Sequence, residues 1–352
     1  MALAESSTST QYFQGNVASG NARVQYGNVH HHYAERTELE QQQRTIKIRV
    51  DRARDVRDTI NDTINWLAAP DASFTHHESY KKHEPGTGRW FLDGEKFSSW
   101  LTAASRILWL HGKAGCCKTT LCSMVIEHIS RHLSGKQGIG FAYFYFSFRD
   151  VAKQSYQAWL LSTISQLLFA TWKKADGIFK LLESRAAILN SRQEDDGPHP
   201  DILDWPVDKL DIAPVYDDLR AARARNHKHP KDLEFILHDL LSCKESAYLV
   251  LDGLDESPET GDLRKDVMEG LKKTVDEHEH VKMLITSRQE SDIEVFMSQL
   301  CDSIVAIEVK PVNDDIMRYV NTEMERHQKL SSLDQSTKND IKCTLAEKAD
   351  GM

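Results

Sequence analysis

Apolar residues recur with two different periods along this chain, and the period predicts which segments are helices and which are strands. In residues 36–68 they recur at spacings of three, four and seven, the pattern of an amphipathic helix. Short apolar runs with polar or glycine-rich borders predict five strands, at residues 106–111, 139–148, 247–257, 281–290 and 303–309. Helical patterns occur at 118–133, 154–172, 232–242 and after Asn313, a residue type that favours the N-cap. The alternation predicts an α/β fold in which helices flank a mostly parallel five-stranded sheet.

Composition along the chain predicts four parts. Residues 1–35 are rich in Ser, Thr, Gln, Asn, Gly and His and poor in aliphatic side chains, which predicts a disordered leader. Residues 36–104 are interpreted as a helical and linker region, and residues 105–312 as the α/β core with a loop-rich insertion at about 190–232. Residues 313–352 begin a further helical region within which the chain stops, as expected of a truncated product, an incomplete gene model or a natural short form.

The overall composition argues against several classes of function. A formal net charge of −9 disfavours nucleic acid as a partner, since duplex binding needs a basic face. The sequence contains no apolar run of roughly 18 residues, so no membrane span is expected, and its beginning does not resemble a secretory signal. The six cysteines show neither a disulfide framework nor the paired spacing of a zinc site. We therefore expect a cytoplasmic protein.

The segment GKAGCCKT at residues 112–119 resembles the phosphate-binding pattern G-x-x-x-x-G-K-[ST], with Cys117 in place of the second glycine. The segment follows a predicted strand and opens a predicted helix. In that setting the backbone N–H groups of a compact loop and the positive end of the helix hold an anion. Lys118 would reach the terminal phosphates, and the hydroxyl of Thr119 would ligate Mg²⁺.

A second group of polar residues follows later strands. An apolar run ends at Asp252, which would lie at the carboxyl edge of the sheet, where open α/β sheets place ligands. Asp252 could hold Mg²⁺, and the nearby Asp255 and Glu256 could orient an attacking water. Arg288 follows the next strand and could contact the γ-phosphate. The alternative interpretation is a polar turn at 252–257 that caps a helix, and a surface arginine.

Four stretches together carry a resemblance to a known family. GKAGCCKTTL, YLVLDGLDES and MLITSRQE, with TGRWFL upstream, resemble the NACHT nucleotide-binding domain. More narrowly, they resemble fungal signal-transducing NTPases of the STAND class that have a nephrocystin-like N-terminal region. The resemblance extends over residues 60 to 352, and D-G-L-D-E is its most specific part. It implies a P-loop NTPase that binds ATP or GTP with Mg²⁺ and whose nucleotide state controls self-association in cell-death or immune-like signalling.

The resemblance also implies a role for individual residues. The loop residues that would bind nucleotide are Gly112, Gly115, Cys116, Cys117, Lys118, Thr119 and Thr120. Thr119 and Asp252 would hold the metal ion. Asp255, Glu256 and Arg288 would take part in hydrolysis, the last as a sensor of the γ-phosphate.

Cys117 departs from the family pattern G-x-x-G-x-G-K-T. The glycine at this position has positive φ in phosphate-binding loops, so a cysteine costs about 1 kcal/mol or more there. Its side chain also points into space that the phosphates use, and we expect weakened nucleotide binding and hydrolysis. A thiol at a helix N-terminus beside Lys118 is further expected to have a lowered pKa, which would permit redox control with Cys116 as partner. The alternative is a substitution that the loop merely tolerates or that marks a decaying site. The alternative function is therefore a hydrolysis-deficient nucleotide-binding or scaffold protein that signals through its N-terminal segment.

The N-terminal segment GNARVQYGNVHHHY, residues 20–33, resembles the HET-s-type amyloid motif of some fungal NACHT proteins. The resemblance implies a downstream effector that is recruited when the assembled segment templates its fold. A flexible leader is the alternative.

Overall fold

The structure is a computed structural model that describes residues 26–102, 105–190 and 216–349. Its centre is a five-stranded sheet in which every strand is parallel to its neighbours, as the sequence predicts. The strands are β1 (Ile107–His111), β2 (Ile139–Tyr145), β3 (Ser246–Asp252), β4 (Val281–Ser287) and β5 (Ser303–Ala306). Their order across the sheet is β2-β3-β4-β1-β5, so that β4 separates β1 from β3. This arrangement is consistent with a P-loop NTPase-like fold.

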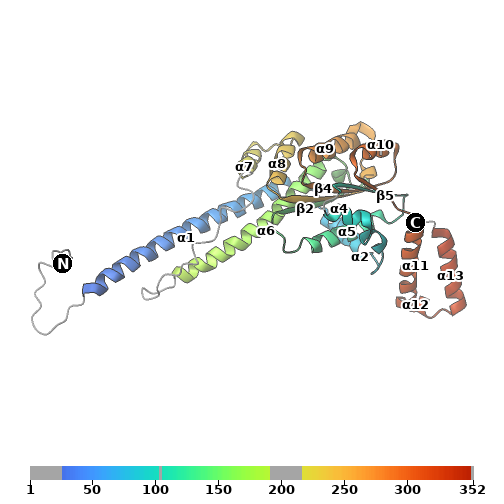
Figure 1. The fold of residues 1–352 in the computed structure, drawn as a ribbon, viewed down its shortest axis with the longest axis horizontal. Coiled ribbons are helices and arrows are strands. Elements are labelled where there is room, and N and C mark those ends of the chain that lie inside the picture. The colour runs from blue at the N-terminus through green and yellow to red at the C-terminus, as the bar shows by residue number, and fades with distance from the viewer. Residues whose placement is uncertain (1–25, 103–104, 191–215, 350–352) are drawn as a thin grey trace, which may run out of the picture. The chain divides into compact units, whose positions relative to one another are not determined.

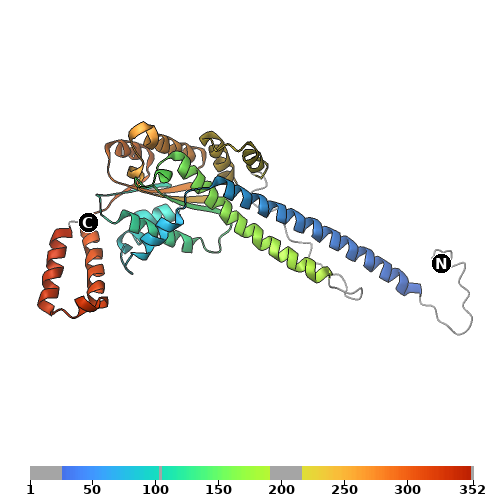
Figure 2. The ribbon, with the colours of Figure 1, turned by 180° about the vertical axis from the view of Figure 1, so that it is seen from behind.

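Helices precede, connect and follow the strands. Before β1 lie α1 (Tyr26–Leu67), α2 (Ser73–Lys81), α3 (Arg89–Leu92) and α4 (Glu95–Thr102). Between strands lie α5 (Lys118–His132), α6 (Tyr156–Asn190), α7 (Tyr216–Arg225), α8 (Pro230–Ser242), α9 (Leu263–Glu277) and α10 (Ser291–Leu300). After β5 come α11 (Val309–Arg326), α12 (Gln328–Ser331) and α13 (Gln335–Ala349). In Figures 1 and 2, α8, α9 and α10 lie over one face of the sheet and α4 and α5 over the other.

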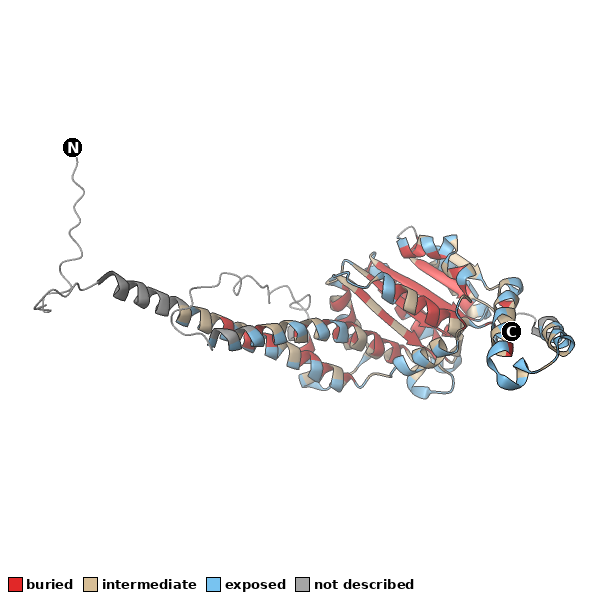
Figure 3. Ribbon diagram, turned by 90° about the horizontal axis from the view of Figure 1, so that it is seen from below, coloured by how far each residue is buried: buried red, intermediate tan, exposed pale blue. Residues whose placement is uncertain are grey.

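The strands are nearly continuous apolar runs because both faces of the sheet are covered. β4 is buried at every position and β3 at every position but its first, whereas the edge strand β5 is partly exposed. Figure 3 shows the buried centre of the sheet. Side chains alternate between the two faces along each strand. Leu249 and Ile285 belong to the core cluster that includes α6, α8, α9 and α10, whereas Val250 and Leu284 belong to the cluster that includes α4 and α5. The sheet therefore separates two hydrophobic cores, one on each of its faces, and contributes side chains to both.

The chain divides into two compact units. The first comprises residues 1–51 and 180–205, and in its described part Ile46, Val50 and Leu182 are buried. The second comprises residues 52–179 and 206–352 and contains the whole sheet. Within the described ranges, every helix is too short or too polar to cross a membrane.

Several predicted boundaries are wrong. α1 begins at Tyr26 rather than at residue 36, so residues 26–35 are helical although they were predicted to belong to the leader. Residues 1–25 lie outside the described residues. They include residues 20–25, the first part of the segment at 20–33 that resembles an amyloid motif. α6 continues to Asn190 rather than ending at 172, and α7 lies within the region predicted to be loop-rich. Residues 191–215 of that predicted insertion are also outside the described ranges.

The last helical region begins earlier than predicted. α11 starts at Val309, with Glu308 as its N-cap, so that Asn313 lies inside the helix instead of capping it. Pro311 is compatible with the first turn because the N–H that proline lacks would have no partner within the helix there. α11 thus crosses the boundary predicted at residues 312 and 313.

Two helical glycines provide a test of core packing. A Cβ added to Gly270 in α9 would lie 2.1 Å from Cε2 of Tyr156, whereas one added to Gly177 in α6 would meet no atom within 4 Å. Alanine is favoured over glycine in a helix by about 1 kcal/mol. We expect Gly177→Ala to stabilise the protein by up to that amount, and Gly270→Ala to destabilise it by about 1–3 kcal/mol through overpacking. Urea unfolding of both variants measures this, and equal shifts would contradict the packing of α9 on Tyr156.

Candidate functional site

The loop after β1 and the ends of β3 and β4 meet at one edge of the sheet. These strands are parallel, so their carboxyl ends share the edge where open α/β sheets bind ligands. A pocket of about 210 Å³ lies there, and it is lined by Ala114, Gly115, Cys117, Lys118, Thr119, Thr120, Asp252, Gly253, Asp255, Glu256 and Arg288. Segments that are far apart in the sequence therefore bring their candidate residues to a single pocket.

The loop between β1 and α5 turns through two left-handed residues. Gly115 has a φ of 79°, and Cys117 has a φ of 61° and a ψ of 24°. The position before Lys118 thus has the backbone conformation expected of a phosphate-binding loop, at a cost of about 1–2 kcal/mol for a residue with a Cβ. Gly112 meets a different requirement, because a Cβ there would lie 2.6 Å from Sγ of Cys116. Glycine at this position lets the loop close over the Cys116 side chain.

The Lys118 side chain folds back over the loop. Its Nζ donates hydrogen bonds to the carbonyl oxygens of Gly112, at 2.8 Å, and of Lys113, at 2.7 Å. α5 begins at Lys118, so the positive end of the helix dipole lies at the same loop. An ammonium group and a helix N-terminus together favour an anion at this position.

Asp252 ends β3 as a buried carboxylate with only 3% of its surface exposed. Its Oδ1 accepts a 2.6 Å hydrogen bond from Oγ1 of Thr286, and the Thr119 side chain also bonds to it. Oγ1 of Thr286 in turn accepts a hydrogen bond from the backbone N–H of Gly253, at 3.0 Å. Burial raises the pKa of Asp252 above its usual value, although these hydroxyls and Lys118 act to lower it. The adjacent hydroxyl and carboxylate oxygens of Thr119 and Asp252 suit a hard cation such as Mg²⁺.

The two acids after Asp252 have different surroundings. The Asp255 side chain is 6% exposed, and Oδ1 accepts the backbone N–H of Arg288 at 2.9 Å while Oδ2 lies 3.1 Å from the Arg288 Nε. Glu256 accepts a longer bond, 3.3 Å, from the backbone N–H of Phe148. Burial raises the pKa of Glu256. Asp255 therefore positions Arg288, and Glu256 is the acid better placed to accept a proton.

The expectation that Cys117 has a lowered pKa is wrong. Although Cys117 as a residue is exposed, the surrounding protein atoms partly desolvate its thiol and raise the thiol pKa, and the neighbouring Cys116 and Asp315 raise it further. Lys118 acts in the opposite direction but is outweighed, and its ammonium bonds to the two loop carbonyls instead. The structure thus gives no support to an activated thiol in the loop.

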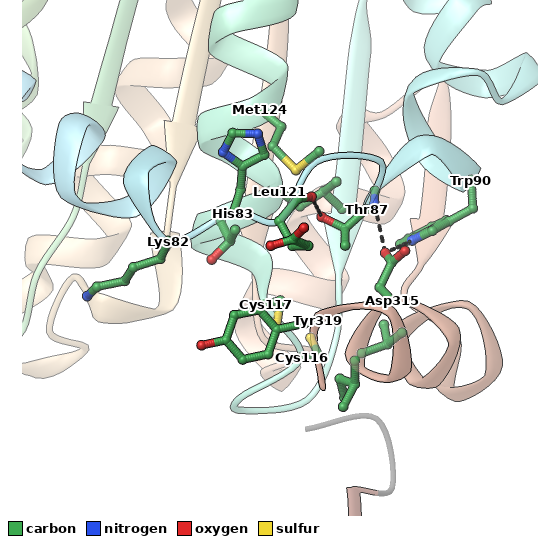
Figure 4. Close-up of a pocket in the computed structure, with 15 residues that line it drawn as sticks. Lys82, His83, Thr87, Trp90, Cys116, Cys117, Leu121, Met124, Asp315 and Tyr319 are labelled. Carbon is green, nitrogen blue, oxygen red and sulfur yellow. Dashed lines mark hydrogen bonds between the residues drawn. The ribbon is translucent and has the colours of Figure 1, made fainter. Parts of the chain in front are cut away.

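A larger cleft adjoins the pocket at the loop, and Figure 4 shows the residues that line this cleft. Its volume is about 340 Å³, and it shares Cys117 and Thr120 with the pocket. Its wall is mostly apolar and includes Leu121 and Met124 of α5 and Tyr319 of α11. This size and this mixture of apolar and polar groups are typical of small-molecule sites.

One carboxylate joins the two sides of the cleft. Oδ2 of Asp315 in α11 accepts hydrogen bonds from the backbone N–H of Gly88, at 2.8 Å, and from Nε1 of Trp90, at 3.1 Å (Figure 4). A second link is the ion pair between Arg326 and Glu84, at 3.0 Å. The segment before α3 and the helix after β5 are thus held together directly beside the loop.

The sequence-predicted residues fall into two groups. Most of them line the pocket, whereas Gly112 and Cys116 do not; Gly112 gives room for Cys116, whose side chain is buried beside the cleft. Sequence reasoning missed Thr286, although it ends the same apolar run that precedes Arg288. It also missed the contact of Asp315 with Gly88, because a hydrogen bond across 227 positions leaves no local pattern.

Comparison of the sequence with known proteins and protein families identifies the family of this chain. No curated protein shows significant similarity to the chain. The family model described as "Nephrocystin 3, N-terminal" matches residues 86–198 and 209–288, which together make up more than half of the chain. The matched ranges include the loop, the end of β3 and Arg288, and the family is associated with NACHT-type regions. The chain therefore belongs to the nephrocystin 3 N-terminal family.

Proposed function

We propose that this protein is a NACHT-type nucleotide-binding switch that binds ATP or GTP with Mg²⁺ and whose nucleotide state controls its self-association. The observation that carries the proposal is the pocket at the sheet edge, where a loop with left-handed turns, a lysine and a helix N-terminus adjoin a buried carboxylate. Such a group of residues holds phosphates together with a cation, whereas a polar turn that only caps a helix needs neither the lysine nor the buried acid.

Phosphate binding would change the contacts of Lys118. Its Nζ now bonds to two loop carbonyls, and a phosphate oxygen would be a stronger, charged acceptor. The backbone N–H groups of the loop would complete the anion site. Thr119 and Asp252 would hold Mg²⁺, which supplies positive charge that offsets the negative charge of the phosphates.

The acids that follow β3 support a hydrolytic step. Glu256 would accept the proton of the attacking water, and Asp255 would orient Arg288 toward the terminal phosphate. Because burial raises the pKa of Glu256, protonation would remove the base at a pH above the usual range for glutamate. As the pH is lowered, the hydrolysis rate should therefore begin to fall at a higher pH than it would with a glutamate of ordinary pKa.

The neighbouring cleft supports a nucleotide rather than a phosphate ion alone. A base and ribose would lie against Leu121, Met124 and Tyr319, in contact with both α5 and α11. A ligand that contacts both helices alters the free energy of the link made by Asp315. This is the physical basis on which we propose that nucleotide state repositions the helical region and so controls self-association.

Cys117 favours a second candidate, a nucleotide-binding or scaffold protein that does not hydrolyse nucleotide. Its side chain lines both the pocket and the cleft. In this case signalling would pass through the N-terminal segment and an effector that it templates. A role in fungal cell-death or immune-like signalling in the cytoplasm belongs to the proposal in either form.

Lys118→Ala tests nucleotide binding itself. We expect the parent protein to bind labelled ATP or GTP in the presence of Mg²⁺, and Lys118→Ala to bind at least about 10-fold more weakly, since hydrogen bonds to charged groups contribute about 1.5–3 kcal/mol. Lys113→Ala is the matched control, because it removes a positive charge from the same loop. Equal binding by Lys118→Ala and Lys113→Ala would contradict the proposed phosphate site.

Substitution of Cys117 separates backbone strain from obstruction of the pocket. Cys117→Ala keeps the Cβ and the left-handed strain, and Cys117→Gly removes both. The left-handed conformation belongs to the fold of the loop, so we expect the glycine variant to be about 1 kcal/mol more stable in urea than the alanine variant. Nucleotide affinity should rise from the parent to Cys117→Ala and again to Cys117→Gly. Identical affinities in all three proteins would show that the side chain does not obstruct the site.

Glu256→Gln tests the role of this acid. The variant should retain nucleotide binding and lose hydrolysis by about 100-fold or more, the usual contribution of a general base. Glu259→Gln is the control, because Glu259 is an exposed acid on the same segment. If the parent binds nucleotide and hydrolyses none, the second candidate function is favoured. Undiminished hydrolysis by Glu256→Gln would assign the proton transfer to another group.

A further inference from the structure

Two histidines and a glutamate gather near the amino end of β4, away from the nucleotide pocket. His238 belongs to α8, Glu277 is the last residue of α9, and His278 follows as the C-cap of that helix. One ligand atom from each residue lies within 4.8 Å of the other two. Nδ1 of His238 is 3.5 Å from Oε2 of Glu277, and the two imidazole rings have centroids 4.7 Å apart.

We propose that His238, Glu277 and His278 form a binding site for a divalent transition-metal ion of the zinc type. Two imidazoles and one carboxylate are a ligand set that Zn²⁺ accepts, whereas Mg²⁺ and Ca²⁺ prefer oxygen ligands alone. Zn–N distances of 2.0–2.1 Å place the ligand atoms of a tetrahedral site about 3.3 Å apart. The spacing between His238 and Glu277 is already close to this value.

The surroundings fix the site and suit a single ion. The His278 backbone carbonyl accepts a 2.8 Å hydrogen bond from Nη2 of Arg106, which also donates to the carbonyl of Val275 at 2.6 Å. The cavity among these side chains measures about 10 Å³, so it has no space for an organic ligand.

The expected role of this ion is structural. α8 and α9 are already joined by the 2.6 Å ion pair between Lys273 and Glu234, and a metal would add a second link between the same helices. The site lies at the opposite end of β4 from Arg288, roughly 20 Å away for a strand of this length. Metal binding should therefore stabilise the fold without changing nucleotide affinity.

Titration of the full chain with Co²⁺, followed by displacement with Zn²⁺, tests the proposal. The background protein carries His30, His31 and His32 replaced by alanine, because three consecutive histidines could bind metal independently. We expect one equivalent of Co²⁺ with the intense visible absorption of a four-coordinate ion and without a near-ultraviolet thiolate band. We also expect Zn²⁺ to raise the midpoint of thermal unfolding.

In that background, His238→Ala and Glu277→Ala should each weaken Zn²⁺ binding by at least about 10-fold. Replacing a residue that only hydrogen-bonds to a metal ligand already lowers metal affinity by that factor. Both side chains are partly exposed, so the variants should fold, which their unfolding midpoint without metal checks. His227→Ala, at an exposed histidine, should leave binding unchanged. Absence of binding in the background protein, a thiolate band, or equal affinity in His238→Ala and His227→Ala would each overturn the site. Nucleotide binding is measured on the same variants, so failure of either proposal is seen separately.

Discussion

Asp252 is a carboxylate with 3% of its surface exposed, and the arrangement around it follows from the need to compensate that burial. Thr286 donates to it from the neighbouring strand, which requires β4 to lie directly beside β3. Thr119 reaches it from the N-terminus of the helix after β1, across the position of β4, which separates β1 from β3. The strand order β2-β3-β4-β1-β5 allows both contacts. A buried acid with hydroxyl partners and a raised pKa is also a group whose charged form would be stabilised by a cation.

The same edge holds a conformation that its sequence does not favour. Cys117 adopts a left-handed backbone although its Cβ makes that conformation costly, and Gly115 two residues before also has positive φ. The loop is held by its ends, since β1 leads into it and α5 begins directly after it, and by Lys118, which bonds to two of its carbonyls. The strain is therefore compensated during folding. The backbone strain of Cys117 therefore affects the stability of the loop, whereas the volume of its side chain would affect the proposed binding of phosphate.

The sheet and the residues of its carboxyl edge could be predicted from the sequence because their signals are local. Each strand is a short apolar run, and the candidate residues follow those runs directly, as Asp252 and Arg288 do. Element boundaries were harder to predict: α1 extends into a polar segment, and α11 begins before Pro311. Contacts between distant segments away from that edge could not be predicted. Nothing near Asp315 indicates that it accepts hydrogen bonds from Gly88 and Trp90, and the pKa of Cys117 was predicted in the wrong direction because Asp315 and burial were not visible.

A parallel sheet has two unlike edges, and in this chain different groups gather at each of them. At the carboxyl edge the strands enter helices through their N-termini, so N–H donors, Lys118 and carboxylate oxygens gather there. At the amino edge helices end before strands begin, and the residues available are C-caps and the last helical turn, which here include His278 and Glu277. Backbone carbonyls at that edge have to be satisfied, as Arg106 does for His278. The direction of the backbone therefore leaves N–H groups free at the first edge, which suits an anion, and carbonyls at the second. The imidazoles of the proposed metal site are supplied by the sequence at that second edge.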